Sequence, residues 1–354
     1  YDDENNWSWG AGVDNVYIYG TPSEGTPGIV WKGDSTSLLS DTTSLTPTFT
    51  PNTNSNPGSY FFTLSVTDSC ATEQSVVIIK TTRGDSTIWT GATDTDWFKD
   101  ANWSCRIPDS SRTAIIANAP PNNCIIGSSG TAKALNIVNQ RTGGNTFSFP
   151  GSGNLYVYGN WQNDGTFSQG TGTVTFKGAG YQAIGGSIAT KFYNLTVNNS
   201  SGNQNVTLTQ NNDTVAAVLA LTQGTLALNG NTLVISNGAS GAVTRSSGFI
   251  QSEGEASVVN WITNTGGSYV FPFGYLGTYI PFTFNKMGNA TTRNISTGTW
   301  NTSIDNNLNL PSGTTLDVDT GTQFFIDRWW AITPVPWTVD VDSAGVTFAF
   351  TTVE

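Results

Sequence analysis

The chain has 354 residues, which is enough for roughly two or three domains. Only 11% of the residues are charged, against about 25% in ordinary globular domains, and the net charge is −11. Such an acidic surface repels nucleic acid and anionic lipid, so we expect neither as a partner. The chain has no histidine, which excludes histidine-activated nucleophiles and histidine-based zinc or iron sites.

The first predicted module covers residues 1–83 and consists of short strands separated by proline, asparagine and glycine turns. The strand segments are Ile29–Trp31, Pro47–Pro51, Ser59–Asp68 and Gln74–Lys80. Short strands at regular spacing predict an Ig-like β-sandwich, followed by a linker over Thr81–Ser86. The residues after Tyr1 resemble the interior of a module rather than its first residues. We therefore expect a segment of a longer polypeptide, with the start of this sandwich missing.

Residues 87–245 are predicted to form an irregular right-handed β-solenoid with a tryptophan-rich N-terminal cap. Short runs carry apolar residues at alternate positions, which predicts strands with one buried face. The clearest positions are Leu219, Leu221, Leu226, Leu228, Leu233 and Ile235, punctuated by Gly224, Gly230 and Gly238. Similar upstream runs are Leu135–Val138, Leu155–Tyr158, Gly172–Phe176, Phe192–Val197 and Asn205–Thr209. Because such short strands cannot bury their apolar face alone, they must stack, with a repeat of roughly 15 to 25 residues.

Residues 246–354 lose these short runs and are predicted to form a C-terminal β-sandwich. Longer segments with alternating aromatic residues are Tyr269–Tyr275, Tyr279–Phe284, Phe324–Ile332 and Val346–Phe350. No convincing helical periodicity is present, and no stretch approaches the apolar length of a membrane span. The predicted fold class is all-β: an Ig-like sandwich, then a β-solenoid, then a second sandwich.

Three motifs carry a resemblance to a known class of proteins. Trp89, Gly91, Trp97, Asn102 and Trp103 resemble a module opening that is common in large secreted proteins of Bacteroidota. Similar matches are Gly58–Asp68, which resembles the last strands of their Ig-like or PKD-like repeats, and Phe271–Phe282 with Arg328–Pro334, which resemble a C-terminal module. The resemblance implies modular, extracellular, cell-surface or adhesin-like proteins of the type IX secretion cargo type. It implies no catalytic residue.

The three cysteines are Cys70, Cys105 and Cys124. Cys105 and Cys124 lie in one predicted module and are predicted to form a disulfide in an oxidising compartment, the alternative being two unpaired buried thiols. Cys70 is then left over, which is consistent with a partner elsewhere.

Oxygen-bearing side chains gather beside the tryptophans of the predicted cap. Asp94, Asp96, Asp100 and Asn102 place hard oxygen ligands at alternate positions, the type of ligand that Ca²⁺ prefers. The alternative is that these residues cap turns without a metal. We expect no cofactor other than calcium.

Five Asp-Ser or Asp-Thr pairs resemble the O-glycosylation signal of Bacteroidota. The candidate glycan acceptors are Ser35, Thr42, Ser86, Thr214 and Ser343.

Catalytic chemistry is weakly supported by the sequence. Carboxylates two positions apart occur at Glu253 and Glu255, at Asp317 and Asp319, and at Asp340 and Asp342, but acids on one strand face are typical of solvated edges. The predicted rungs carry sparse charges without clustering: Asp164, Lys177, Lys191, Asp213 and Arg245. Tryptophans that could stack on sugars, or pack in the core, are Trp7, Trp9, Trp329, Trp330 and Trp337.

The sequence therefore favours a non-enzymatic protein: a structural or adhesive segment of a large secreted cell-surface protein, forming a stiff extracellular β-rich rod or fibre. The expected partners are other modules or copies of the same polypeptide, with glycans or surfaces as further candidates. The alternative is a β-helical polysaccharide lyase or hydrolase, or a carbohydrate-binding module attached to one.

Overall fold

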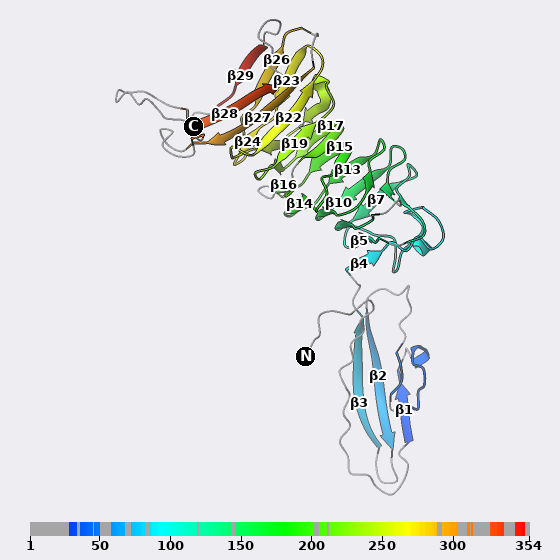
Figure 1. Ribbon diagram of the computed structural model, residues 1–354. Helices are drawn as coiled ribbons and strands as arrows, with labels where there is room; N and C mark the ends of the chain where they lie inside the picture. Colours follow the sequence, from blue (N-terminus) through cyan, green and yellow to red (C-terminus); the bar gives the residue numbers. More distant parts are fainter. Residues whose placement is uncertain are drawn as a thin grey trace. The chain divides into compact units, whose positions relative to one another are not determined.

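The computed structural model describes residues 28–33, 36–44, 46–49, 58–67, 72–81, 85–118, 120–142, 146–201, 205–210, 212–288, 292–302, 310–311, 313, 326–335 and 344–350. The chain divides into two compact units, Tyr1–Asp85 and Ser86–Glu354 (Figure 1). The described residues contain no α-helix. Single 3₁₀ turns lie at Thr36–Leu38, Asp100–Asn102 and Ser240–Ala242.

The first unit contains one antiparallel sheet in the order β1-β2-β3. Its strands are β1 (Gly28–Lys32), β2 (Gly58–Thr67) and β3 (Thr72–Thr81). Trp31, Phe62, Leu64 and Ile79 form its small core. The second layer that an Ig-like sandwich requires is not among the described residues, so the predicted sandwich is not confirmed.

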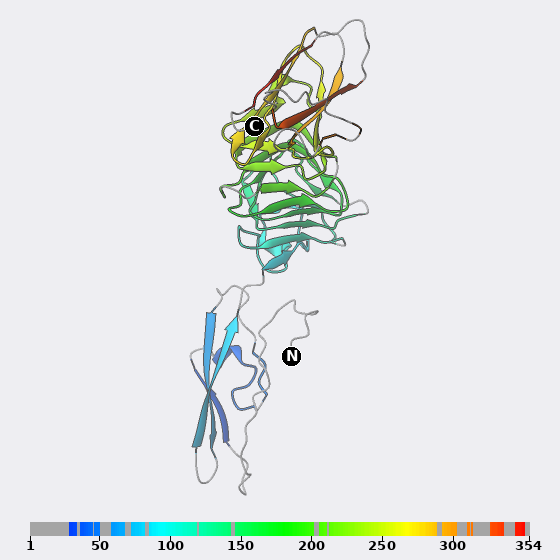
Figure 2. The ribbon, with the colours of Figure 1, turned by 90° about the vertical axis from the view of Figure 1, so that its left-hand side faces the viewer.

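The second unit is a β-solenoid of about seven turns. Three sheets of stacked parallel strands make up its walls. The first contains β7 (Thr131–Ala134), β10 (Asn154–Val157), β13 (Thr173–Phe176), β15 (Lys191–Asn198), β17 (Asp213–Gln223), β19 (Thr232–Ile235) and β20 (Val243–Arg245). Strands of the first two sheets alternate along the chain, and those of the third sheet occur only up to β12, which confirms the predicted stacking of short strands (Figure 2).

The other two walls follow the same pattern. The second sheet contains β4 (Ser86–Ile88), β5 (Thr113–Ile116), β8 (Ile137–Asn139), β11 (Trp161–Asn163), β14 (Gln182–Gly185), β16 (Asn205–Leu208), β18 (Thr225–Ala227) and β21 (Phe249–Gln251). The third sheet is short and contains β6 (Cys124–Ile125), β9 (Phe147–Ser148) and β12 (Phe167–Ser168).

Columns of apolar side chains fill the inside of the solenoid. In the first sheet Ala132, Leu155, Val174, Leu195 and Leu219 lie in register on five successive strands. Each is at most 1% exposed. Because side chains alternate between the two faces of a strand, this column buries one face of every rung against its neighbours.

Asparagine side chains at the turns join each rung to the next. Asn136 Oδ1 accepts the Asn160 N–H at 2.7 Å, and Asn160 Oδ1 accepts the Ala183 N–H at 2.8 Å. Inside the stack, Asn139 Nδ2 donates to Asn163 Oδ1 at 2.8 Å. The paired positions are 23 or 24 residues apart. Along the apolar column the strand registers give further spacings between 19 residues (Leu155 to Val174) and 24 residues (Leu195 to Leu219), which lie within the predicted repeat of 15 to 25 residues.

The parallel stack passes directly into antiparallel strands at its C-terminal end. β22 (Val258–Thr263) pairs with β19 in parallel, and on its other side with β27 (Arg293–Asn301), which pairs with β28 (Arg328–Val335). Because these strands extend the first sheet, the predicted boundary between residues 245 and 246 does not separate two compact units.

A second antiparallel layer covers this end. It consists of β23 (Gly267–Phe271), β26 (Phe282–Lys286) and β29 (Ala344–Phe348), with a short hairpin of β24 (Gly274–Tyr275) and β25 (Thr278–Tyr279). Trp261 of β22 packs against Tyr269 and Phe271 of β23, with ring centroids 5.1 and 5.2 Å apart. The two layers pack face to face, but a separate C-terminal sandwich is not confirmed, because one layer belongs to the solenoid sheet.

Asp213 is a carboxylate buried at the start of β17, with 1% exposure. Its Oδ1 accepts the Thr190 N–H at 2.6 Å, whereas Oδ2 has no hydrogen-bond partner among the described residues. Thr190 Oγ1 in turn accepts the indole N–H of Trp161 at 3.0 Å. Burial raises the pKa of Asp213 from 3.8 to about 7, against the opposing effect of the Thr190 hydrogen bond.

Replacing Leu195 by alanine should lower the free energy of unfolding by about 2–5 kcal/mol, because it opens a cavity in the apolar column. The control is Thr196→Ala, on the adjoining outward position of the same strand, which should change stability by less than about 1 kcal/mol. Urea unfolding of the full chain, followed by tryptophan fluorescence, measures both. Equal losses would show that the two faces of β15 are wrongly assigned.

Asp213→Asn should change how stability depends on pH. Since the folded pKa is raised, the folded protein keeps a proton between about pH 4 and pH 7 that the unfolded chain releases, so wild-type stability falls as the pH rises through this window. The variant has no such carboxyl group. Between about pH 4 and pH 7 the free energy of unfolding should therefore fall by roughly 2–4 kcal/mol more for the wild type than for the variant. Urea unfolding at several pH values measures the two curves; parallel curves would contradict the raised pKa.

Candidate functional site

The tryptophan-rich segment forms a buried aromatic cluster at the N-terminal end of the solenoid. Trp89, Trp97 and Trp103 are each at most 5% exposed. The rings of Trp97 and Trp103 lie 4.7 Å apart, those of Trp89 and Trp103 5.1 Å apart, and Trp97 stacks on Phe147 of β9 at 6.0 Å. These three rings close the end of the core and are not available to stack on a ligand.

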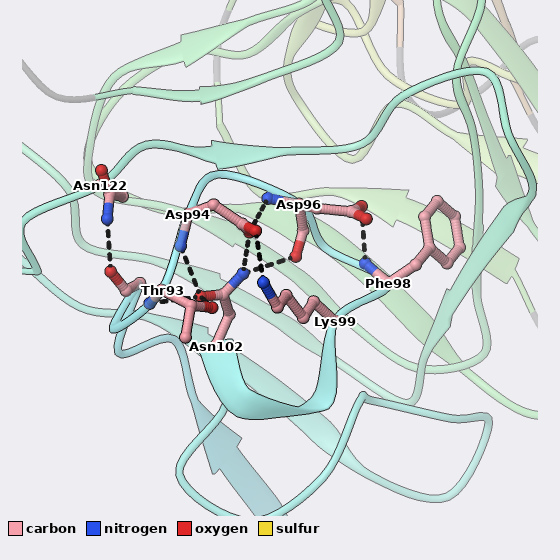
Figure 3. Close-up of polar contacts among 8 residues, drawn as sticks. Thr93, Asp94, Asp96, Phe98, Lys99, Asn102 and Asn122 are labelled. Carbon is pink, nitrogen blue, oxygen red and sulfur yellow. Dashed lines mark hydrogen bonds and ion pairs between the residues drawn. The ribbon is translucent and has the colours of Figure 1, made fainter.

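Asn102 holds the loop of this cap together (Figure 3). Its fully buried side chain accepts the N–H groups of Thr93 and Asp94 at 3.0 and 3.1 Å, and the Thr93 hydroxyl at 2.6 Å. Its Nδ2 donates to Asp94 Oδ1 at 2.6 Å and to the Asp96 carbonyl at 3.0 Å. One amide therefore fixes the backbone of the whole loop.

The neighbouring carboxylates also accept hydrogen bonds within the loop. Lys99 Nζ lies 2.8 Å from Asp94 Oδ2 and, together with the Asp96 N–H and Asn102, holds the pKa of Asp94 at about 2. Asp96 Oδ1 accepts the Phe98 N–H at 3.0 Å. Asp100 Oδ1 accepts the Ile107 N–H at 2.9 Å.

The structure therefore brings three of the four predicted calcium ligands, Asp94, Asp96 and Asn102, into one network, whereas Asp100 binds the Ile107 N–H further along the chain. Their contacts are those of turn caps, the alternative that the sequence left open. Within the part of the chain that the structure describes, no group of three or more acidic, cysteine or histidine side chains is arranged to hold a metal. Calcium binding here stays a prediction.

The predicted disulfide is not formed: Cys105 and Cys124 are both free thiols. Cys124 is fully buried in β6, where burial raises the pKa of its thiol well above the usual value and the nearby Arg141 opposes that shift. Cys105 is only half-buried in the loop after Trp103. One thiol is thus a core side chain and the other a loop side chain. Cys70 lies outside the described residues.

The predicted glycan acceptors fall in different settings. Ser86 is exposed at the start of β4, while Thr42 and Thr214 are half-buried. The Thr214 hydroxyl donates to the Asn212 carbonyl at 3.0 Å. Ser35 and Ser343 lie outside the described residues. Glycosylation at these positions stays a prediction.

The charged residues of the rungs do not converge on one place. Lys177 Nζ lies 4.6 Å above the Tyr156 ring, the Arg245 guanidinium lies 3.7 Å above the Tyr279 ring, and Asp213 is buried. Glu253 Oε1 lies 2.8 Å from Nη1 of the buried Arg328 and forms an ion pair with it. The pairs Asp317 with Asp319 and Asp340 with Asp342 lie outside the described residues.

The outer face of the second sheet carries two adjoining pockets that the sequence analysis did not foresee. The Tyr181 pocket has a volume of about 320 Å³ and is lined by Tyr181, Thr207, Ala227, Asn229, Gln251, Ser252 and Glu253. The Gln162 pocket has a volume of about 480 Å³ and is lined by Asn160, Trp161, Gln162, Asp164, Ala183, Gly185, Gly186, Ser187 and Thr209. Together we call them the outer-face groove.

The register of the strands places the two pockets side by side. Ala183, Thr207, Ala227 and Gln251 occupy corresponding positions on β14, β16, β18 and β21. Ala183 lines one pocket and Thr207 the other. The small side chains of Ala183, Thr207 and Ala227 leave space beside larger neighbours such as Tyr181.

The tryptophans proposed as sugar-stacking candidates are not part of this groove. Trp330 of β28 packs against the core and lies 5.2 Å from the Phe348 ring, and Trp329 is half-buried. Trp7, Trp9 and Trp337 lie outside the described residues. The aromatic side chain that does line the groove in an exposed position is Tyr181, 54% exposed.

Comparison of the chain with protein-family models, curated proteins and solved structures finds no match. Among the described residues, no helix is long and apolar enough to cross a membrane.

Asn102→Ala should destabilise the cap by roughly 2–4 kcal/mol, because it leaves several buried hydrogen-bonding groups without a partner. The control is Lys99→Ala, which removes only the half-exposed ion pair with Asp94 and should have a small effect.

Urea unfolding of the full chain, in calcium and in chelator, measures both variants of the cap. A loss for Asn102→Ala no larger than that for Lys99→Ala would contradict the central role of Asn102. Stabilisation of the wild type by calcium that both Asp94→Asn and Asp96→Asn abolish would establish the predicted calcium site.

Proposed function

We propose that this chain is a structural or adhesive segment of a large secreted cell-surface protein, in which the β-solenoid serves as a stiff extracellular scaffold. The observation that carries the proposal is the unbroken hydrogen-bonded stack from β7 to β28 in the first sheet. Backbone ladders tie each rung to the next, an apolar column joins β7 to β17, and asparagines bridge some of the turns. Such a stack resists bending and local opening, because no rung can leave without exposing its neighbours.

The positions and partners of the charged side chains support a role without catalysis. Glycoside hydrolysis needs two acids facing each other across a sugar, about 5–9.5 Å apart. Glu253, one acid of the pair Glu253 and Glu255, has both oxygens occupied: Arg328 binds Oε1, and the Asn301 N–H donates to Oε2 at 3.0 Å. Neither pocket of the groove is lined by lysine or arginine, side chains that a lyase would use on an acidic polysaccharide.

Two measurements on the full chain test this proposal. Under native conditions, proteinase K should leave a large fragment that starts near Ser86 and contains the stacked rungs, identified by mass spectrometry. Incubation with neutral and acidic polysaccharides should release no new reducing ends and no unsaturated uronates. Rapid cleavage inside β10–β19 would contradict the stiff scaffold, and turnover of any polysaccharide would favour the enzymatic alternative.

A further inference from the structure

We propose that the outer-face groove binds a neutral oligosaccharide chain, laid across the strands β11, β14, β16, β18 and β21. The inference goes beyond the proposed scaffold role, because a scaffold needs no such groove. It rests on the shape of the groove, on its unpaired hydrogen-bonding groups, on its charge and on one exposed aromatic ring.

The dimensions of the groove fit an extended chain. Parallel strands lie roughly 4.8 Å apart, so five successive strands span about 19 Å. The Tyr181 pocket alone, at about 320 Å³, lies at the small end of the range of about 300–1,000 Å³ that small-molecule sites occupy. Two such pockets in line accommodate several sugar units of one chain better than a single compact ligand.

Thr207 places a hydroxyl group at the floor of the Tyr181 pocket, where it can bind a polar ligand. Its side chain lines the Tyr181 pocket although it is only 8% exposed. Its in-register neighbours on the same face are Ala183 and Ala227, which offer no polar group. No hydrogen bond to the Thr207 hydroxyl is formed among the described residues. The hydroxyl faces the open pocket, so a sugar hydroxyl bound there can take the place of solvent as its hydrogen-bond partner.

The hydrogen-bonding groups around Thr207 are mostly uncharged. Tyr181, Asn229 and Gln251 present a phenol and two amides to the pocket. Groups that both donate and accept hydrogen bonds match the hydroxyls of a sugar, which also do both. The half-buried amide of Gln251 and the exposed phenol of Tyr181 have no hydrogen-bond partner within the described part of the chain.

Electrostatics exclude an acidic polysaccharide. The carboxylate of Glu253 at the edge of the Tyr181 pocket is neutralised by Arg328 at 2.8 Å. In the Gln162 pocket, the Ser187 N–H donates to Asp164 Oδ1 at 2.7 Å and lowers the pKa of that carboxyl, so Asp164 is ionised at neutral pH. With no cation lining either pocket, uronate or sulfate groups would meet an uncompensated negative charge.

Tyr181 supplies the apolar contact that sugar binding requires. Its ring is 54% exposed at the border of the pocket, immediately before β14. One face of a pyranose ring presents C–H groups, which pack against an aromatic ring, while its hydroxyls reach polar neighbours. Tyr181 on one side can therefore pack against the C–H face of a sugar unit, while Thr207 on the floor can bind its hydroxyls.

The test is isothermal titration calorimetry on the full chain with four neutral hexasaccharides (cello-, xylo-, manno- and N-acetylchitohexaose), with hexagalacturonate as the charged counterpart. At least one neutral hexasaccharide should bind, and hexagalacturonate should bind at least about tenfold more weakly. Tyr181→Ala should lower the affinity for the neutral hexasaccharide by about tenfold or more. Ala227→Gln, which fills the floor of the groove between Thr207 and Gln251, should abolish binding.

The matched control is Tyr193→Ala, the same change at a half-buried tyrosine of β15 that lines neither pocket, which should leave binding unchanged. Thermal unfolding verifies that all three variants are folded. The proposal is overturned if no neutral hexasaccharide binds at millimolar concentration, if hexagalacturonate binds most tightly, or if binding survives both Tyr181→Ala and Ala227→Gln. Failure here leaves the scaffold role intact, because that role is tested by protease resistance and by the absence of turnover.

Discussion

The register between successive rungs is the constraint on which the rest of the solenoid depends. A strand shifted by one residue would turn its apolar side chains outward, because the side-chain period of a strand is two. The turn asparagines resist that shift: Asn136 is bonded to the backbone of Asn160, and Asn160 to that of Ala183, each one rung further on. The apolar column supplies the stability, and the asparagines set which residues meet in it.

A stack of parallel rungs has two open ends, and this chain closes them differently. At the N-terminal end Trp97 and Trp103 cover the core, and the Asn102 amide holds their loop in place. At the other end β22 switches to antiparallel pairing with β27, and a second layer covers the exposed face. Both closures cover the core where stacking stops. Exposed strand edges promote association between copies, so closing the ends also limits uncontrolled polymerisation.

The strands could be predicted from the sequence, whereas their arrangement across rungs could not. The alternation at Leu226, Leu228 and Leu233 identified β18 and β19 because that signal is local. Contacts between rungs are also made by polar residues such as Asn139 and Asn163, which the apolar pattern does not reveal. The continuation of the first sheet past residue 246 could not be predicted either, because aromatic alternation there indicates antiparallel strands but not that β22 pairs with β19.

The groove shows why a site of this kind escapes sequence analysis. Ala183, Thr207, Ala227 and Gln251 are separated by 20 to 24 positions and become neighbours only through the register of four strands. None of them is chemically conspicuous alone, whereas conspicuous residues such as Trp97 and Glu253 are occupied in the cap and in an ion pair. A rigid stack holds such a row in place before any ligand arrives, so little entropy is lost on binding. The same register that makes the solenoid stiff therefore also makes its outer face a preorganised surface for a repeating, extended ligand.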